Sequence, residues 1–185
     1  MRIISGVAKG TKLQTLDGKN TRPTLDRVKE SLFNILQTDI LESEFLDVFA
    51  GSGAIGLEAA SRGAKRVILG DSSKKACEII NLNINKVHLG NKVKVFNLCS
   101  DKLLKLLVKQ KFNLIYIDPP YENINLVKET VELILNYELL NEEHIIIIET
   151  DNEEVVLKKI STIDINIIDK RKYGRVSLIF LTKKD

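Results

Sequence analysis

Four consecutive residues, Asp118-Pro119-Pro120-Tyr121, combine groups that could act on an amino group. They end an apolar run that predicts a buried strand. Two successive prolines cannot continue a sheet ladder, and each restricts the residue before it. The turn therefore offers the Asp118 carboxylate and the Pro119 carbonyl as fixed acceptors, with the Tyr121 ring as a stacking surface. This set suits a planar heterocycle with an exocyclic NH2 group. The competing interpretation is a stiff loop without a chemical role.

A second motif lies in residues 47–56, where Gly51-x-Gly53-x-x-Gly56 matches the glycine fingerprint of nucleotide cofactor sites. Such glycines let the backbone and a helix N-terminus approach the ligand closely. Asp71 ends the next predicted strand twenty residues after Gly51, where an acid would bind ribose hydroxyls. NAD enzymes and S-adenosylmethionine enzymes share both features. The residues expected to bind the cofactor here are Phe49, Ala50, Gly51, Ser52, Gly53, Asp71 and Ser72.

Three more acids favour S-adenosylmethionine as the cofactor. Asp47 stands four residues before the first glycine, where it could receive the methionine ammonium group, whereas a pyrophosphate has no use for a carboxylate. Asp101, preceded by Ser100, follows the third strand and could accept from the adenine amine. Asp118 reaches the same edge, because the carboxyl ends of parallel strands meet at the ligand crevice. Each acid alone could be a helix cap or a solvated loop residue.

The elements that must position these motifs alternate between strand and helix from residue 45 onwards. The predicted strands are 45–49, 66–70, 93–98, 112–118 and 144–149, and the predicted helices are 54–62, 73–87, 101–109 and 125–136. Strands without hydrophobic alternation indicate a parallel sheet covered on both faces. The sequence thus predicts an α/β fold with a doubly wound, Rossmann-like sheet.

Both ends of the chain depart from this alternation. Residues 163–169 and 176–182 predict a C-terminal antiparallel hairpin, joined through the basic turn 170–175. At the other end, residues 2–5 and 11–15 predict a small β-hairpin. Thr24 could cap a helix that runs from Leu25 to about Gln37.

Positive charge is concentrated in the first 40 residues. They contain seven basic and four acidic side chains, which accounts for the whole net charge of +3. This asymmetry favours a polyanion as partner, although an ordinary solvated surface predicts it almost as well. Neither the two histidines nor the two cysteines have metal-ligand spacing, so no metal is expected. The sequence has no membrane-spanning apolar stretch and no signal-peptide pattern, which predicts a cytoplasmic protein.

The motifs taken together resemble the bacterial 16S ribosomal RNA guanine-N2-methyltransferases called RsmD. The resemblance extends over nearly the whole chain, and its most specific part is the segment Arg22-Pro23-Thr24-x-Asp26-Arg27. It departs from the family pattern at three positions: Asp71 replaces the more frequent Glu, Ser100 replaces a glycine, and Arg175 replaces an acid or small polar residue.

The resemblance implies a methyltransferase sheet, S-adenosylmethionine as cofactor and 16S rRNA as partner, in an assembling small ribosomal subunit. It implies transfer of a methyl group to the N2 amine of a guanine, with Asp118, Pro119, Pro120 and Tyr121 as the catalytic turn. We expect one methyltransferase domain, 1–185, with an N-terminal extension (1–40) that contacts RNA and a catalytic core (41–185). The residues expected to contact RNA are Lys9, Arg22, Thr24 and Arg27.

Three other functions remain open at this point. A DNA amino-methyltransferase acting on adenine N6 or cytosine N4 could use the same turn, but usually needs an added target-recognition region. A nicotinamide oxidoreductase would explain the glycine loop but not Asp47 or the turn at Asp118. A non-catalytic rRNA-binding assembly factor would be expected to have a degraded loop or turn, and both are intact here.

Overall fold

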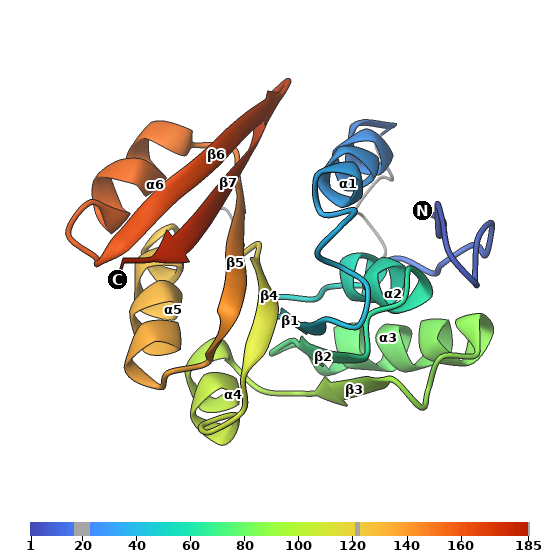
Figure 1. Cartoon of the computed structure of the whole chain (residues 1–185). Coiled ribbons are helices and arrows are strands. Elements are labelled where there is room, and N and C mark those ends of the chain that lie inside the picture. The colour runs from blue at the N-terminus through green and yellow to red at the C-terminus, as the bar shows by residue number, and fades with distance from the viewer. Residues whose placement is uncertain (17–22, 121–122, 185) are drawn as a thin grey trace.

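The computed structural model describes residues 1–16, 23–120 and 123–184 of the chain. Its strands are β1 (Glu44–Asp47), β2 (Arg66–Gly70), β3 (Val93–Phe96), β4 (Phe112–Ile117), β5 (Leu140–Thr150), β6 (Ile165–Tyr173) and β7 (Val176–Lys183). Its helices are α1 (Pro23–Ile35), α2 (Ala54–Ser61), α3 (Lys74–Val87), α4 (Ser100–Leu106), α5 (Asn125–Asn136) and α6 (Glu153–Ile160). Figure 1 shows their arrangement.

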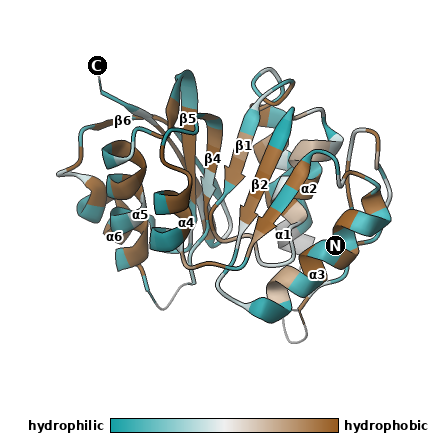
Figure 2. Ribbon diagram, turned by 90° about the horizontal axis from the view of Figure 1, so that it is seen from below, coloured by the Kyte–Doolittle hydropathy of each residue, from teal (hydrophilic) through white to brown (hydrophobic). Residues whose placement is uncertain are grey.

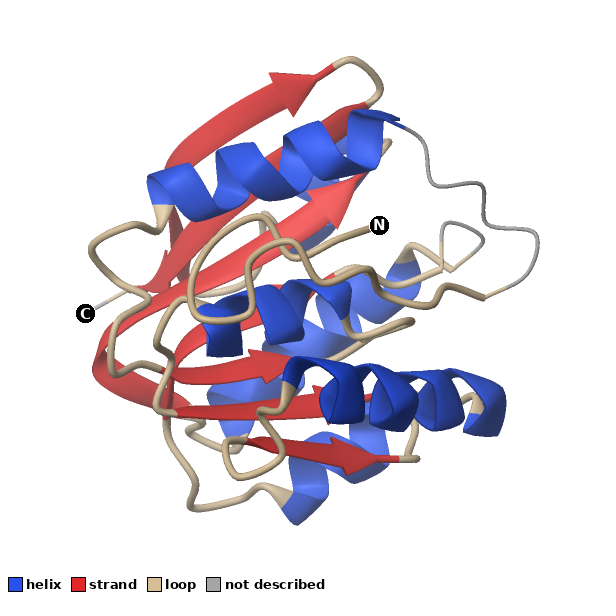
Figure 3. Ribbon diagram, turned by 90° about the vertical axis from the view of Figure 1, so that its right-hand side faces the viewer, coloured by secondary structure: helices blue, strands red, loops and turns tan. Residues whose placement is uncertain are grey.

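The strands form one sheet in the order β3-β2-β1-β4-β5-β7-β6. Strands β1 to β5 are parallel to one another, whereas β7 runs antiparallel to both β5 and β6. The predicted doubly wound sheet with an antiparallel C-terminal hairpin is therefore confirmed. In Figure 3 the parallel strands point towards one side of the molecule, so the loops that follow them gather there.

Two hydrophobic cores cover the two faces of the sheet. One contains buried residues of α1, α2 and α3, such as Leu32, Leu57 and Ile80. The other contains buried residues of α4, α5 and α6, such as Leu103 and Val131. In Figure 2 the helices α3, α5 and α6 carry both hydrophobic and hydrophilic residues, as expected when one side of a helix packs on a sheet. The fold is thus a three-layer α/β/α sandwich.

The C-terminal part differs from the prediction in two respects. The helix α6 was not predicted, because in an eight-residue helix only Val156 and Ile160 are buried and the apolar period is correspondingly weak. The hairpin is also longer than predicted. Strand β6 continues to Tyr173, so the basic residues 170–172 lie on a strand and the turn contains only Gly174, with a φ of 65°, and Arg175.

The N-terminal segment folds back on itself but forms no regular hairpin within residues 1–16. A single antiparallel bridge joins Arg2 to Lys12, where two strands were predicted. Around this bridge the N–H of Ile3 donates to the Thr11 carbonyl and the N–H of Leu13 to the Met1 carbonyl, both at 3.0 Å. The backbone N–H groups of Ile4 and Ser5 donate to the two carboxylate oxygens of Glu58, at 2.8 and 2.9 Å. The two predicted segments thus pair as a short antiparallel bridge, and the Glu58 carboxylate holds the fold-back against α2.

The helix α1 also begins earlier than predicted. It starts at Pro23 and ends at Ile35, so Thr24 lies inside its first turn and the prediction that Thr24 precedes the helix as its cap was wrong. A proline is favoured at the first helical position, because its missing N–H would have no partner there. Within the described residues, no helix is long and apolar enough to cross a membrane.

Candidate active site

A cavity of about 1160 Å³ opens where the parallel strands end. It is lined by the loop after β1, the end of β2, the start of α4 and the turn after β4. Of the predicted cofactor-binding residues, Gly53 does not line this cavity. Those that do are Asp47, Phe49, Ala50, Gly51, Ser52, Asp71, Ser72, Ser100, Asp101 and Asp118. The structure thus brings together residues from four strand ends.

The glycine loop has the close packing that its sequence predicted. Gly53 precedes α2 with a φ of 79°, a left-handed conformation that favours glycine. A Cβ atom on Gly56 would lie 2.2 Å from Cδ2 of Leu69, so this glycine lets α2 pack closely on β2. The loop therefore lies close to the sheet, and its residues Gly51 and Ser52 line the cavity.

Asp71 fastens the glycine loop to the end of β2. Its Oδ2 atom accepts from the N–H of Gly51 at 2.8 Å, and its Oδ1 atom accepts from the N–H of Ser73 at 2.8 Å. Each carboxylate oxygen can accept a second hydrogen bond. Asp71 can thus orient the loop and bind a ribose hydroxyl at the same time.

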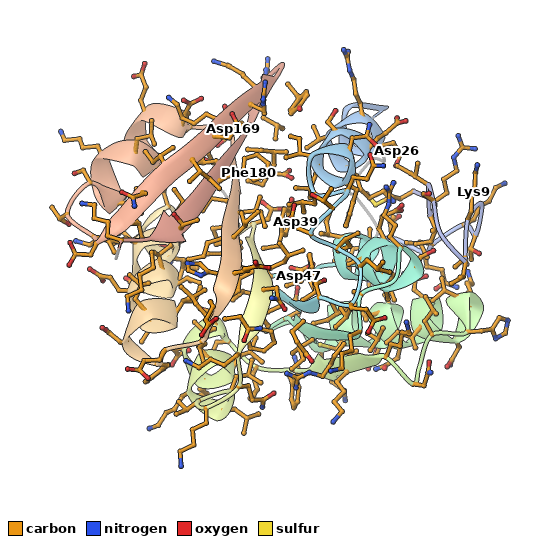
Figure 4. The ribbon with its side chains drawn as sticks, in the orientation of Figure 1. Lys9, Asp26, Asp39, Asp47, Asp169 and Phe180 are labelled. Atoms are coloured by element: carbon orange, nitrogen blue, oxygen red, sulfur yellow. The ribbon has the colours of Figure 1, made fainter. Side chains whose placement is uncertain are left out.

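Asp47 ends β1 inside the protein, as Figure 4 shows. It is 1% exposed, and its Oδ1 atom has no hydrogen-bond partner among the described residues. Burial, together with the nearby Asp71 and Glu149 carboxyls, raises the pKa of Asp47 to about 8. An approaching cation would favour the ionised form. The unpaired Oδ1 atom of Asp47 therefore fits a ligand with an ammonium group.

Ser100 and Asp101 begin α4 on the opposite wall of the cavity. Ser100 is buried, whereas the Asp101 side chain is exposed. Hydrogen bonds from Cys99 and from the backbone of Lys102 lower the pKa of Asp101. Asp101 is thus held as a carboxylate, which could accept from the amine of a bound base.

The predicted catalytic turn follows β4 at the same edge. Asp118, Pro119 and Pro120 line the cavity, and Asp118 is half-buried. Tyr121 lies outside the described residues, so its stacking role stays a prediction. The cofactor side and the catalytic side of the cavity are therefore continuous.

Two of the residues predicted to contact RNA, Lys9 and Arg27, do not line this cavity. Lys9 and Arg27 are exposed. Figure 4 shows Lys9 at the periphery of the N-terminal segment. Thr24 lies in the first turn of α1, and Arg22 lies outside the described residues. Lys9 and Arg27 therefore belong to the protein surface and not to the floor of the cavity.

Sequence reasoning gave no cofactor or catalytic role to several other residues that line the cavity, among them Lys29, Tyr116, Glu149 and Arg175. Glu149 could have been found, because it follows the apolar run 145–148 and so lies at a strand end like the other acids. Lys29 and Tyr116 have no such signal. Among the described residues, no group of three or more His, Cys, Asp or Glu side chains could hold a metal ion.

The order of the sheet, the glycine loop after β1 and the acids at the ends of β1, β2 and β4 define the class of Rossmann-like methyltransferases. A solved structure described as a putative methyltransferase, yhhF from Escherichia coli, superposes with a TM-score of 0.85 and 29% identity, covering 100% of this chain and 98% of that one.

More narrowly, the sequence matches the family model described as conserved hypothetical protein 95 over residues 1–182, and the chain belongs to this family. A putative rRNA methyltransferase, YlbH from Bacillus subtilis, is 34% identical over the full length of both chains. The ribosomal RNA small subunit methyltransferase D of Haemophilus influenzae is 36% identical, covering 85% of this chain and 82% of that protein. The family resemblance seen in the sequence is therefore confirmed.

Proposed function

We propose that this protein transfers a methyl group from S-adenosylmethionine to the N2 amine of a guanine in 16S rRNA. The observation that carries the proposal is the continuity of one cavity, which joins the glycine loop to the Asp118-Pro119 turn. The names of the relatives, which refer to ribosomal RNA, support this class of substrate.

The cofactor would lie along the ends of β1, β2 and β3. Asp47 would bind its ammonium group, Asp71 its ribose hydroxyls and Asp101 the adenine amine. The unpaired Oδ1 atom of Asp47 and the spare acceptor positions of Asp71 support this assignment. When bound, S-adenosylmethionine supplies an electrophilic methyl group on its sulfonium.

The turn after β4 would activate the target amine. The N2 amine of guanine is a poor nucleophile, because its lone pair is delocalised into the purine ring. Asp118 and the Pro119 carbonyl would accept its two hydrogens and draw the nitrogen towards tetrahedral geometry. Tyr121 would stack on the base, which must leave its helix or loop to enter the cavity. Positioning of this kind carries much of the catalysis.

The function is tested by mapping N2-methylguanine in 16S rRNA from cells with and without this gene. We expect one modified guanine to disappear in the deletion strain and to return when the gene is supplied again. Purified protein should methylate this RNA, or the assembling subunit, but not duplex DNA. A complete set of modified guanines in the deletion strain, or transfer to duplex DNA, would refute the proposal.

For the cofactor, we expect Asp71→Ala to weaken S-adenosylmethionine binding by about 1–3 kcal/mol, because the ribose loses a charged acceptor. Part of this effect should come from the loop, since Gly51 loses its hydrogen bond to Asp71 as well. Titration calorimetry measures the change. Unchanged affinity in a folded variant would mean that Asp71 neither binds the ribose nor holds the loop in its binding conformation.

For RNA, we infer that residues 1–40 form an extension that holds the RNA beside the catalytic core, 41–185. Arg27 is exposed, and in the described part of the chain no acid forms an ion pair with it. It is therefore available to phosphate. The start of α1 and the tip of the β6–β7 hairpin lie on the same side of the molecule in Figures 1 and 3.

Replacing Arg22 and Arg27 together by alanine should weaken RNA binding, with cofactor affinity preserved. The slope of log binding constant against log salt concentration should become smaller by about one to two units. The matched control removes two exposed lysines, Lys105 and Lys158, from the helices on the opposite face of the sheet. If the arginine variant binds RNA normally across a salt series, the RNA-binding surface would instead lie at the β6–β7 hairpin. There Lys172 and Arg175 are exposed, whereas Lys170 pairs with Glu153.

A further inference from the structure

Glu149 is a buried acid on the wall of the cavity to which the mechanism above gives no role. It lies near the end of β5, is 5% exposed and lines the same cavity as Asp118. Burying a carboxyl group is costly unless the group is hydrogen-bonded. A buried acid that faces a substrate cavity is therefore a candidate for substrate recognition.

One oxygen of Glu149 is held by Tyr116. The Tyr116 hydroxyl donates to Oε2 of Glu149, and the ring is 2% exposed. Burial and the nearby Glu149 and Asp118 carboxyls raise the pKa of this phenol, so the hydroxyl keeps its proton and remains a donor. Among the described residues, this is the only hydrogen bond that the Glu149 carboxyl makes. Its Oε1 atom therefore remains to accept from a ligand.

The strand register places Glu149 beside the catalytic turn. Ile117 of β4 pairs with Ile148 of β5 in a parallel ladder, so Asp118 and Glu149 are the next residues on neighbouring strands. Lys29 lines the cavity as well, but its ammonium group is engaged by Glu58 at 3.1 Å and by the backbone carbonyl of Arg2. Arg175 lines the cavity too. Burial raises the pKa of Glu149, but the hydrogen bond from Tyr116 lowers it and favours the carboxylate. Asp118 and Glu149 thus bring two acceptor groups to this part of the wall.

Hydrogen-bond acceptors on the cavity wall match the Watson–Crick edge of guanine better than that of adenine. Guanine presents N–H donors at two neighbouring positions, the ring nitrogen N1 and the exocyclic nitrogen N2, whereas N1 of adenine is an acceptor. A flipped base is read through this edge. If Asp118 and Pro119 take the hydrogens of the N2 amine, the next acceptor along the edge meets N1–H.

We propose that Glu149, oriented by Tyr116, accepts the N1–H of the target guanine and thereby selects guanine. The inference rests on the proposed function, since it concerns the same base in the same cavity. Glu149 is then a specificity residue that touches the substrate, and Tyr116 is a positioning residue. A site built to pair with a donor discriminates strongly against an analogue that lacks it, because the buried acceptor is left unpaired.

The test compares guanine with 2-aminopurine at the mapped position of the RNA or subunit that the protein methylates. The analogue keeps the N2 amine but carries a lone pair at N1. We expect the native protein to prefer guanine by about 100-fold or more in kcat/KM. Glu149→Gln should reduce this preference to about tenfold or less, because a carboxamide can accept from guanine or donate to the analogue.

Tyr116→Phe provides a second variant, and it keeps every carboxylate. It should lower the preference for guanine by about tenfold while leaving S-adenosylmethionine affinity within a factor of two, and it replaces Glu149→Gln if that variant does not fold. The matched control is Asp151→Asn, an exposed acid that does not line the cavity and should retain the native preference.

Each result decides the inference. An unchanged preference in either folded variant, or an equal loss on guanine and 2-aminopurine, overturns the role of Glu149 in selection. Failure of the native protein to methylate guanine N2 in any rRNA substrate would instead refute the proposed function, so the two failures are distinguishable.

Discussion

Replacing Asp118 by alanine should lower the single-turnover rate of methyl transfer by about 10²–10⁴-fold, with S-adenosylmethionine affinity close to normal. The residue follows β4 beside the glycine loop, and two prolines fix the turn that presents it. In the proposed mechanism its carboxylate acts mainly on the target amine, so cofactor affinity should change little. Rapid-quench measurements with excess protein separate this chemical step from binding.

The isosteric variant Asp118→Asn distinguishes two roles of the same group. The amide oxygen can still accept one amine hydrogen but takes up a proton far less readily. A rate close to native would mean that Asp118 orients the amine, and a rate as low as that of alanine would make it the proton acceptor. Asp151→Asn, after β5 but outside the cavity, should have no effect. An Asp118→Ala variant with native turnover would exclude this turn from the chemistry.

Glu58→Gln should lower the free energy of unfolding by about 3–5 kcal/mol, the range for breaking a buried ion pair on one side. The Glu58 side chain is fully buried and accepts from four donors on three segments. Arg62 and Lys29 approach it at 2.8 and 3.1 Å, in addition to the N–H groups of Ile4 and Ser5. The side-chain amide of glutamine would place its own N–H donors against some of these four donors. Urea denaturation measures the loss.

An exposed ion pair provides the control for this measurement. Lys128 and Glu132 on α5 are 3.7 Å apart, with side chains 39% and 44% exposed, so Glu132→Gln should cost less than about 1 kcal/mol. Hydrogen exchange should show faster exchange at Ile4 and Ser5 in the Glu58 variant. Equal costs for the two variants would mean that Glu58 does not hold the N-terminal segment to α2.

The sequence by itself determined which polar residues lie at the ends of the parallel strands. The apolar run before each acid and the glycine pattern after β1 predict where each strand ends. They therefore place Asp47, Asp71 and Asp118 at strand ends. Because parallel strands bring their carboxyl ends to one edge of the sheet, these groups were expected to meet there. The residues that bind the cofactor in our proposal follow from this reasoning, and all of them except Gly53 line the cavity.

The tertiary structure alone decided which groups meet across distant segments. Lys29 and Glu58 lie on different helices and join only when α1 packs beside α2. The contact of Tyr116 with Glu149 depends on the register between β4 and β5, which has no local signal. Helix α6 was missed for the same reason, since its two buried residues depend on the sheet beneath them. A short motif fixes its own backbone, but a buried polar contact depends on how whole elements pack.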